Sequence, residues 1–204
     1  MLLPTPKHTP LQIPRWEWRT IASSLGELRN SLAGVSIENV RNINETYLLC
    51  TQSSHNAKIR NGVMDLKWRK QVHPDGPELW DRVLGSDFPC RAEFIVQLFQ
   101  AWGIELVDLR RESYTLDQFL NEVVALHPAL LALSVCKQEE AFSHDGAACA
   151  FQRIEAGDLH LEGFRIEHED PTLIADALRG LGLEGQENVN YPEALKHALG
   201  LIPT

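Results

Sequence analysis

The segment 56–70, NAKIRNGVMDLKWRK, constrains the fold most, because it predicts a hairpin with two chemically different faces. The dipeptide Asn61-Gly62 is a strong signal for a two-residue turn between strands. Side chains alternate between the two faces of a strand, so one face carries large apolar residues and the other is charged. The charged face carries Lys58, Arg60, Asp65, Lys67 and Arg69. Four cations therefore gather on one side of one hairpin.

Other segments alternate in the same way. In 15–22, RWEWRTIA, Trp16 and Trp18 share one face, and Arg15, Glu17 and Arg19 share the other. Further strands are predicted over 45–50, 104–116, 130–142, 147–156 and 161–170. Helices with apolar stripes are predicted over 23–33, 89–103, 116–128, 170–183 and 191–200. The tryptophans that face away from the cations, Trp68 among them, are expected to pack under these helices.

One arrangement satisfies both the charged strand faces and the apolar helix stripes. It is an α+β fold in which a closed antiparallel β-barrel forms a tunnel with a polar interior and the helices pack outside. Buried charges cost several kcal/mol each unless they pair, stay hydrated or hold a ligand. A polyanion with a divalent metal would meet that need. The alternative is an ordinary α+β sheet with solvated charged faces, which suits any one strand better than it suits several.

Composition narrows the class of protein. The 204 residues carry a net charge of -9, which argues against nucleic-acid binding driven by overall charge. The four cysteines are widely spaced without a CxxC pair, so we expect buried free thiols and cytoplasmic residence. Residues 1–14 are interpreted as an irregular leader without a signal peptide or membrane span, and 15–204 as a single domain. His160 and His168 are interpreted as surface histidines, because no metal-binding spacing includes them.

Taken together, several stretches resemble the CYTH superfamily of triphosphate tunnel enzymes, which includes class IV adenylate cyclases, thiamine triphosphatases and inorganic triphosphatases. NAKIRNG and VMDLKWR are similar to the paired basic strands of that family, and RWEWR stands in the place of its N-terminal Glu-x-Glu-x-Lys motif. RIEHEDP resembles its acidic C-terminal strand, and ENVNYPEAL its closing segment. The resemblance implies a tunnel barrel of about eight antiparallel strands.

The resemblance also implies roles for individual residues. Glu17 and Lys67 are assigned to catalysis. The predicted substrate-binding residues are Arg19, Lys58, Arg60, Lys67, Arg69 and Lys137. The predicted ligands of Mg²⁺ or Mn²⁺ are Glu17, Glu167 and Glu169. Three positions depart from the family pattern: Arg15 replaces an expected Glu, Glu139 an expected Arg, and Gln152 an expected Asp.

These observations predict a protein that binds and hydrolyses a triphosphate-containing anion, either tripolyphosphate or an organic triphosphate, with a divalent metal. The alternative is a non-catalytic module that binds a phosphorylated ligand and has a degenerate metal site. Whether the chain is an enzyme is left open by the three departures. The expected partner is a small phosphorylated ligand or polyphosphate, with neither nucleic acid nor membrane, and a homodimer is left open. Adenylate cyclase activity ranks last, because no base-recognising residues are located.

Overall fold

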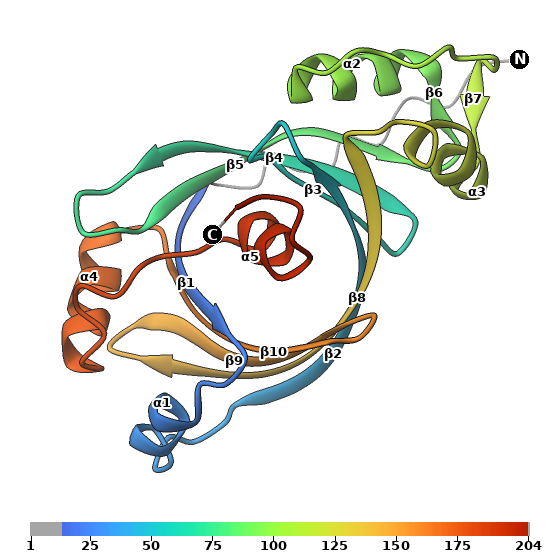
Figure 1. Ribbon diagram of the computed structural model, residues 1–204. Coiled ribbons are helices and arrows are strands. Elements are labelled where there is room, and N and C mark those ends of the chain that lie inside the picture. The colour runs from blue at the N-terminus through green and yellow to red at the C-terminus, as the bar shows by residue number, and fades with distance from the viewer. Residues whose placement is uncertain (1–13, 204) are drawn as a thin grey trace, which may run out of the picture.

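Eight strands close into an antiparallel barrel in the computed structural model, which describes residues 14–203 (Figure 1). The strand order is β1-β10-β9-β8-β2-β3-β4-β5, and β5 pairs with β1 to complete the ring. The barrel strands are β1 (Arg15–Ala22), β2 (Asn39–Cys50), β3 (Asn56–Arg60), β4 (Val63–Val72), β5 (Glu78–Asp87), β8 (Leu130–His144), β9 (Ala147–Ala156) and β10 (Leu159–His168). The predicted closed barrel and α+β class are confirmed. The predicted leader lies, but for residue 14, outside the described residues.

The helices lie between or after these strands. They are α1 (Gly26–Ser31), α2 (Ala92–Trp102), α3 (Leu116–Phe119), α4 (Pro171–Gly180) and α5 (Tyr191–Ala198), and a π-helical turn, η1 (Leu120–Val124), continues α3. A separate two-stranded sheet joins β6 (Cys90–Arg91) to β7 (Ser113–Tyr114) beside α2 and α3. No helix within residues 14–203 has the length and apolar character that crossing a membrane requires.

The charged hairpin forms as predicted. Strands β3 and β4 pair with Lys58 opposite Asp65. Asn61 and Gly62 have φ values of 51° and 74°, the left-handed pair that a type I′ turn requires. Burial follows the predicted alternation, with Ile59 and Met64 in the core.

Two apolar clusters cover the outside of the barrel. The first joins the apolar face of the hairpin to α2, α3 and η1, and the second packs α4 against the outer faces of β1, β9 and β10. Trp16 and Trp18 are buried in the second cluster, as predicted. Trp68 corrects the prediction: it is 40% exposed and lies in an edge-on contact with His55, because β4 is exposed from this residue to its end.

Helix α5 departs from the expectation that every helix packs outside. It lies at one end of the barrel and overlaps the ring of strands in Figure 1. Its buried Tyr191 and Leu195 join the barrel residues Leu49, Val135 and Ile154 in a third apolar cluster. The side chains that face inward at this end are apolar and need a cover, which α5 provides. The barrel is therefore a cup, with a floor formed by this cluster.

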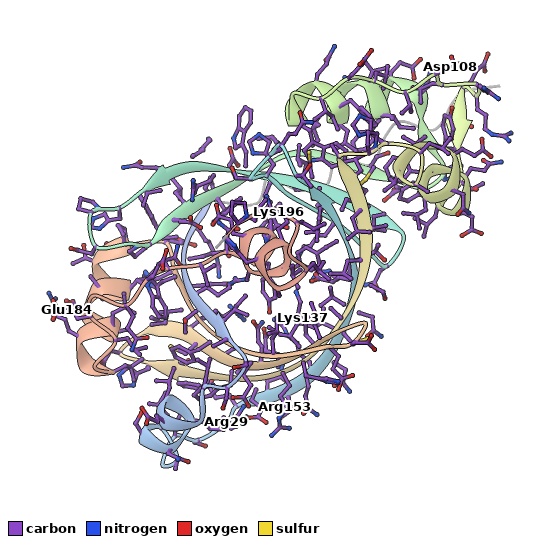
Figure 2. The ribbon with its side chains drawn as sticks, viewed as in Figure 1. Arg29, Asp108, Lys137, Arg153, Glu184 and Lys196 are labelled. Atoms are coloured by element: carbon purple, nitrogen blue, oxygen red, sulfur yellow. The ribbon has the colours of Figure 1, made fainter. Side chains whose placement is uncertain are left out.

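Helix α5 is also tied to the barrel wall by hydrogen bonds. Lys196 is buried, and its Nζ donates to the carbonyls of Cys50 at 3.3 Å and Ser53 at 3.0 Å (Figure 2). Asn190 caps the helix by accepting from the Glu193 amide at 3.1 Å. The floor is therefore fixed to β2 and the turn that follows it.

Several sequence expectations are corrected. Strand β5 was not predicted, because its apolar residues fall on both faces and hide the alternation. The strand predicted over 104–116 is wrong except at Ser113–Tyr114, since alternation alone forms no ladder without a partner strand. Of the four cysteines, Cys136 is exposed and the other three are buried free thiols.

Candidate anion-binding site

The inner surface of the cup is strongly cationic. It encloses a cavity of about 270 Å³ whose lining includes nine Lys and Arg side chains and four carboxylates, a formal excess of five positive charges in a protein of net charge -9. The cations are Arg15, Arg19, Arg41, Lys58, Arg60, Lys67, Arg82, Lys137 and Arg165. The carboxylates are Glu17, Glu45, Glu139 and Glu167. The strand faces that alternation predicted to be charged thus meet inside one cavity.

Glu45 organises the first group of cations. Its carboxylate accepts from Lys58 Nζ at 2.7 Å and from Lys137 Nζ at 2.5 Å, and Arg60 Nη1 lies 3.4 Å away. Burial opposes ionisation of Glu45, but Lys58 and Lys137 outweigh it and hold the pKa of this carboxyl at about 2. Burial also lowers the pKa of Lys58, and it lowers that of Lys137 to about 7. Glu45 is therefore a fixed anion that orients two desolvated ammonium groups.

Two tyrosines form the floor beneath these cations. Lys137 Nζ donates to the Tyr47 hydroxyl at 2.8 Å and lies 4.0 Å from the centre of the Tyr191 ring (Figure 2). The Arg19 guanidinium lies 4.7 Å from the same ring. The Tyr191 hydroxyl donates to Gln152 Oε1 at 2.5 Å. The first residue of α5 thus supports the deepest cations of the cup by cation–π contact.

Glu139 organises the opposite wall. Arg165 donates to it twice, each time at 3.1 Å, Arg41 Nη2 lies 2.6 Å away, and Gln152 Nε2 donates at 2.6 Å. Burial opposes ionisation, yet Arg165 and the other donors hold the pKa of Glu139 at about 2. Two of the three departures from the family pattern, Glu139 and Gln152, therefore lie in contact. They form one hydrogen-bonded unit with two arginines.

The three predicted metal ligands do not form a common site. Glu17 and Glu167 are cross-strand partners on β1 and β10. Glu169 lies beyond the end of β10, where it is exposed and 3.8 Å from Arg15 Nη2. Across residues 14–203, no group of three or more His, Cys, Asp or Glu side chains is placed to hold a metal ion.

Cations already neutralise the Glu17–Glu167 pair. Arg19 Nη2 lies 2.8 Å from Glu17 and 3.7 Å from Glu167. Lys67 Nζ lies 3.6 Å from Glu17, and Arg165 Nη1 lies 2.7 Å from Glu167. Burial opposes ionisation of Glu17, but Arg19 and Lys67 lower its pKa overall. The donor set therefore does not fit a divalent cation, because the two convergent carboxylates serve as counter-ions for arginine and lysine.

Most of the predicted substrate-binding residues meet in the cup. Arg19, Lys58, Arg60, Lys67 and Lys137 all belong to its lining. Arg69 does not: it binds Glu78 at 2.5 Å and lies 4.0 Å from Glu193 of α5. Glu17 and Lys67, predicted to be catalytic, lie in ionic contact. Their roles stay predictions.

Sequence reasoning missed three of the cup arginines, and treated Arg15 only as a departure. Arg41 lies in the first half of β2, which the predicted strand over 45–50 left out. Arg82 lies on β5, which was not predicted. Arg165 shares a strand face with Glu167 by simple alternation, so the sequence did contain the signal for it.

Comparisons with known proteins add little beyond the shape of the barrel. No protein-family model and no curated protein matches the chain. Among solved structures, a candidate adenylyl cyclase from Hippeastrum, described as having a dominant triphosphatase activity, is 10% identical with a TM-score of 0.46, over 93% of this chain and 97% of that one. A candidate adenylate cyclase from Bacillus halodurans is 9% identical with a TM-score of 0.43, over 89% and 93%. A conserved hypothetical protein from Pyrococcus furiosus is 12% identical with a TM-score of 0.44, over 88% and 98%.

Sequence identities and TM-scores this low do not establish a shared function. The fold and the site are therefore described from the geometry of this chain alone. The eight antiparallel strands and the polar interior are those that the CYTH resemblance implies. The fold is a closed antiparallel barrel of eight strands, covered at one end by α5. The site inside it differs from the predicted one in its arginine content and in the pairing of its carboxylates.

Proposed function

We propose that the cup binds a triphosphate-containing anion, either tripolyphosphate or the triphosphate group of an organic molecule. One observation carries the proposal: the cup concentrates an excess of five cations on its inner walls, while the whole protein is acidic. Like charges held this close destabilise the folded state unless a ligand or water neutralises them. A linear chain of phosphates carries several negative charges in a volume that suits a cavity of about 270 Å³.

The geometry of the arginine side chains supports a phosphate-containing ligand over a neutral one. Six of the nine cup cations are arginines, whose planar guanidinium groups donate two parallel N–H bonds to phosphate oxygens. The side chains of Arg15, Arg41 and Arg60 are 50%, 51% and 47% exposed, so their donors are accessible from solvent. The cup therefore combines buried cations for affinity with accessible guanidinium groups for capture.

The test is calorimetric titration of the full chain with tripolyphosphate, comparing Arg60→Ala with the wild type. Loss of one charge-assisted contact to phosphate is expected to raise Kd by about tenfold or more. The matched control is Arg153→Ala, because Arg153 is an exposed arginine on β9 that donates to Gln138 and lies outside the cup lining. Equal affinities for the two variants would refute the proposal.

Hydrolysis of the bound anion is the second candidate function. The observation that favours it is the position of Glu17, a cup carboxylate whose lowered pKa keeps it ionised beside Lys67. A carboxylate held ionised by cations is a weak general base, which is why binding ranks first. Phosphate release from tripolyphosphate, ATP and thiamine triphosphate measures this activity directly. Phosphate release by the wild type that is lost in Glu17→Gln, while this variant still binds tripolyphosphate, would assign Glu17 to hydrolysis.

Cytoplasmic residence is also a proposal. Three of the four cysteines are buried free thiols, as is common in a reducing compartment.

A further inference from the structure

Every carboxylate that lines the cup is already in contact with at least two cations. Glu139 accepts from Arg165 and Gln152 and pairs with Arg41. Glu45 has three cationic partners. Glu17 and Glu167 share Arg19 and are each contacted by a second cation. A divalent ion entering the cup would have to displace these partners against a local excess of positive charge, which Coulomb repulsion opposes.

Two buried guanidinium nitrogens of the cup, in the described residues, make no hydrogen bond. Arg165 is 8% exposed, and its Nη1 has no hydrogen-bond partner among the described residues. Glu167 Oε1 lies 2.7 Å away, but the pair is not aligned as a hydrogen bond. Arg82 Nε is likewise buried without a hydrogen-bond partner in residues 14–203, although the same guanidinium pairs with Asp65. Unpaired buried N–H groups are costly, and a ligand oxygen would satisfy them.

These guanidinium groups come from several directions around the cavity. Arg41 is on β2, Arg82 on β5 and Arg165 on β10, and all three residues line the cup. Arg15 on β1 and Arg60 on β3 add half-exposed guanidinium groups. An anion in the cavity would therefore find fixed positive charge on several sides. In sites that use a divalent ion, that ion supplies this charge.

We infer that the cup selects the metal-free form of a triphosphate-type anion, with guanidinium groups in place of a divalent metal. The inference rests on the proposed function and adds which species of the ligand is recognised. A magnesium complex of the same anion brings fewer net negative charges and an extra cation into a cavity that is already cationic. Binding of Mg²⁺ to the ligand and binding of the ligand to the protein therefore oppose each other.

The experiment is calorimetric titration of the full chain with tripolyphosphate, once in EDTA and once with Mg²⁺ in excess over the ligand. We expect binding in EDTA and at least about fivefold weaker binding in Mg²⁺, the range of an ordinary coupling between two ligands. Binding that appears only with Mg²⁺ or Mn²⁺, or that tightens with them, would overturn the inference and leave the proposed function standing. Absence of binding under both conditions would overturn both.

Two variants separate arginine recognition from general attraction. Arg41→Ala is suitable because Glu139 loses the hydrogen bond from Arg41 but keeps those from Arg165 and Gln152. Arg15→Ala removes a half-exposed side chain whose partner, Glu169, is itself exposed. Each is expected to weaken metal-free binding by about tenfold, and the control Arg153→Ala to leave it unchanged. Unchanged affinity in both variants would show that these guanidinium groups do not bind the anion.

Discussion

At the residue scale, Lys137 is the cation most sensitive to its surroundings. It is 5% exposed and lies between Glu45, the Tyr47 hydroxyl and the Tyr191 ring. Burial is the main reason that its pKa is lowered to about 7, although Glu45 acts in the opposite direction. Near neutral pH this ammonium group is therefore only partly protonated. A bound anion would favour the charged form and raise its pKa.

The consequence is a pH-dependent affinity. Because the bound state holds the proton more tightly than the free state, binding takes up a proton and Kd rises as pH rises through about 7. The measurement is calorimetry with tripolyphosphate across this range, in two buffers of different ionisation enthalpy. Proton uptake should appear as a buffer-dependent heat, and Lys137→Met should reduce it. The ligand's own titration is common to both proteins, so equal uptake in wild type and variant would contradict the prediction.

At the element scale, α5 turns an open barrel into a cup. Its Leu195 is fully buried among inward-facing barrel residues, and Lys196 ties the helix to Cys50 and Ser53. The helix has only eight residues, so it is too short to be stable by itself in water. Its position therefore depends on these tertiary contacts.

Truncating the buried Leu195 tests whether the position of α5 depends on its tertiary contacts. Leu195→Ala is expected to lower the free energy of unfolding by about 2–5 kcal/mol, the usual cost of deleting a buried leucine side chain. The matched control is Leu126→Ala, because Leu126 is 69% exposed; its effect should stay within about 0.5 kcal/mol. Urea denaturation measures both variants. A loss at Leu195 no larger than at Leu126 would show that α5 is not part of the folded core.

The elements also show what the sequence could and could not predict. The hairpin at Asn61-Gly62, strand β1 and helix α4 follow from local signals, namely a turn dipeptide, clean alternation and a capping Asp170. Strand β5 and the position of α5 do not, because both depend on the far side of the barrel. A closing strand can carry apolar residues on either face, and an amphipathic helix shows which face is buried but not which surface it covers.

The site was predictable to a similar degree. The alternation in the hairpin predicted that Lys58, Arg60 and Lys67 share one strand face, and all three side chains line the cup. The pairing of Glu139 with Arg41 and Arg165 joins three strands that are distant in sequence, and no local pattern encodes it. Glu139 therefore looked like the loss of a cation, whereas in the fold it orients two of them.

At the scale of the whole molecule, the two carboxylate-centred groups hold the barrel closed. Glu45 links β2 to β3 and β8, and Glu139 links β8 to β2, β9 and β10. Both are almost fully buried, at 4% and 1% exposure. Most of the barrel strands thus meet through two ionised side chains.

Acid should therefore weaken the whole barrel. The pKa values of Glu45 and Glu139 are about 2 in the folded state, against an ordinary value of 4.5 for a glutamate side chain, so the unfolded chain binds more protons between these values. Stability present above pH 4.5 is lost as pH falls toward 2, by about 3 kcal/mol for each carboxylate. Urea unfolding at neutral pH and at about pH 3 measures the larger part of this loss, about 2 kcal/mol for each carboxylate, and Glu139→Gln should show a smaller one. A free energy of unfolding that is the same at neutral pH and at about pH 3 would contradict this prediction.

The floor made by α5 has one more consequence for how a ligand enters and leaves. A barrel open at both ends would let a polymer thread through, whereas a dead end admits only a terminus. A long phosphate chain would be held by its last few units, with the remainder trailing in solvent. An organic triphosphate would insert with its phosphates first and keep its bulky group near the entrance, beside Arg15, Arg41 and Arg60. Recognition would then concern the end of a molecule, whatever is attached behind it.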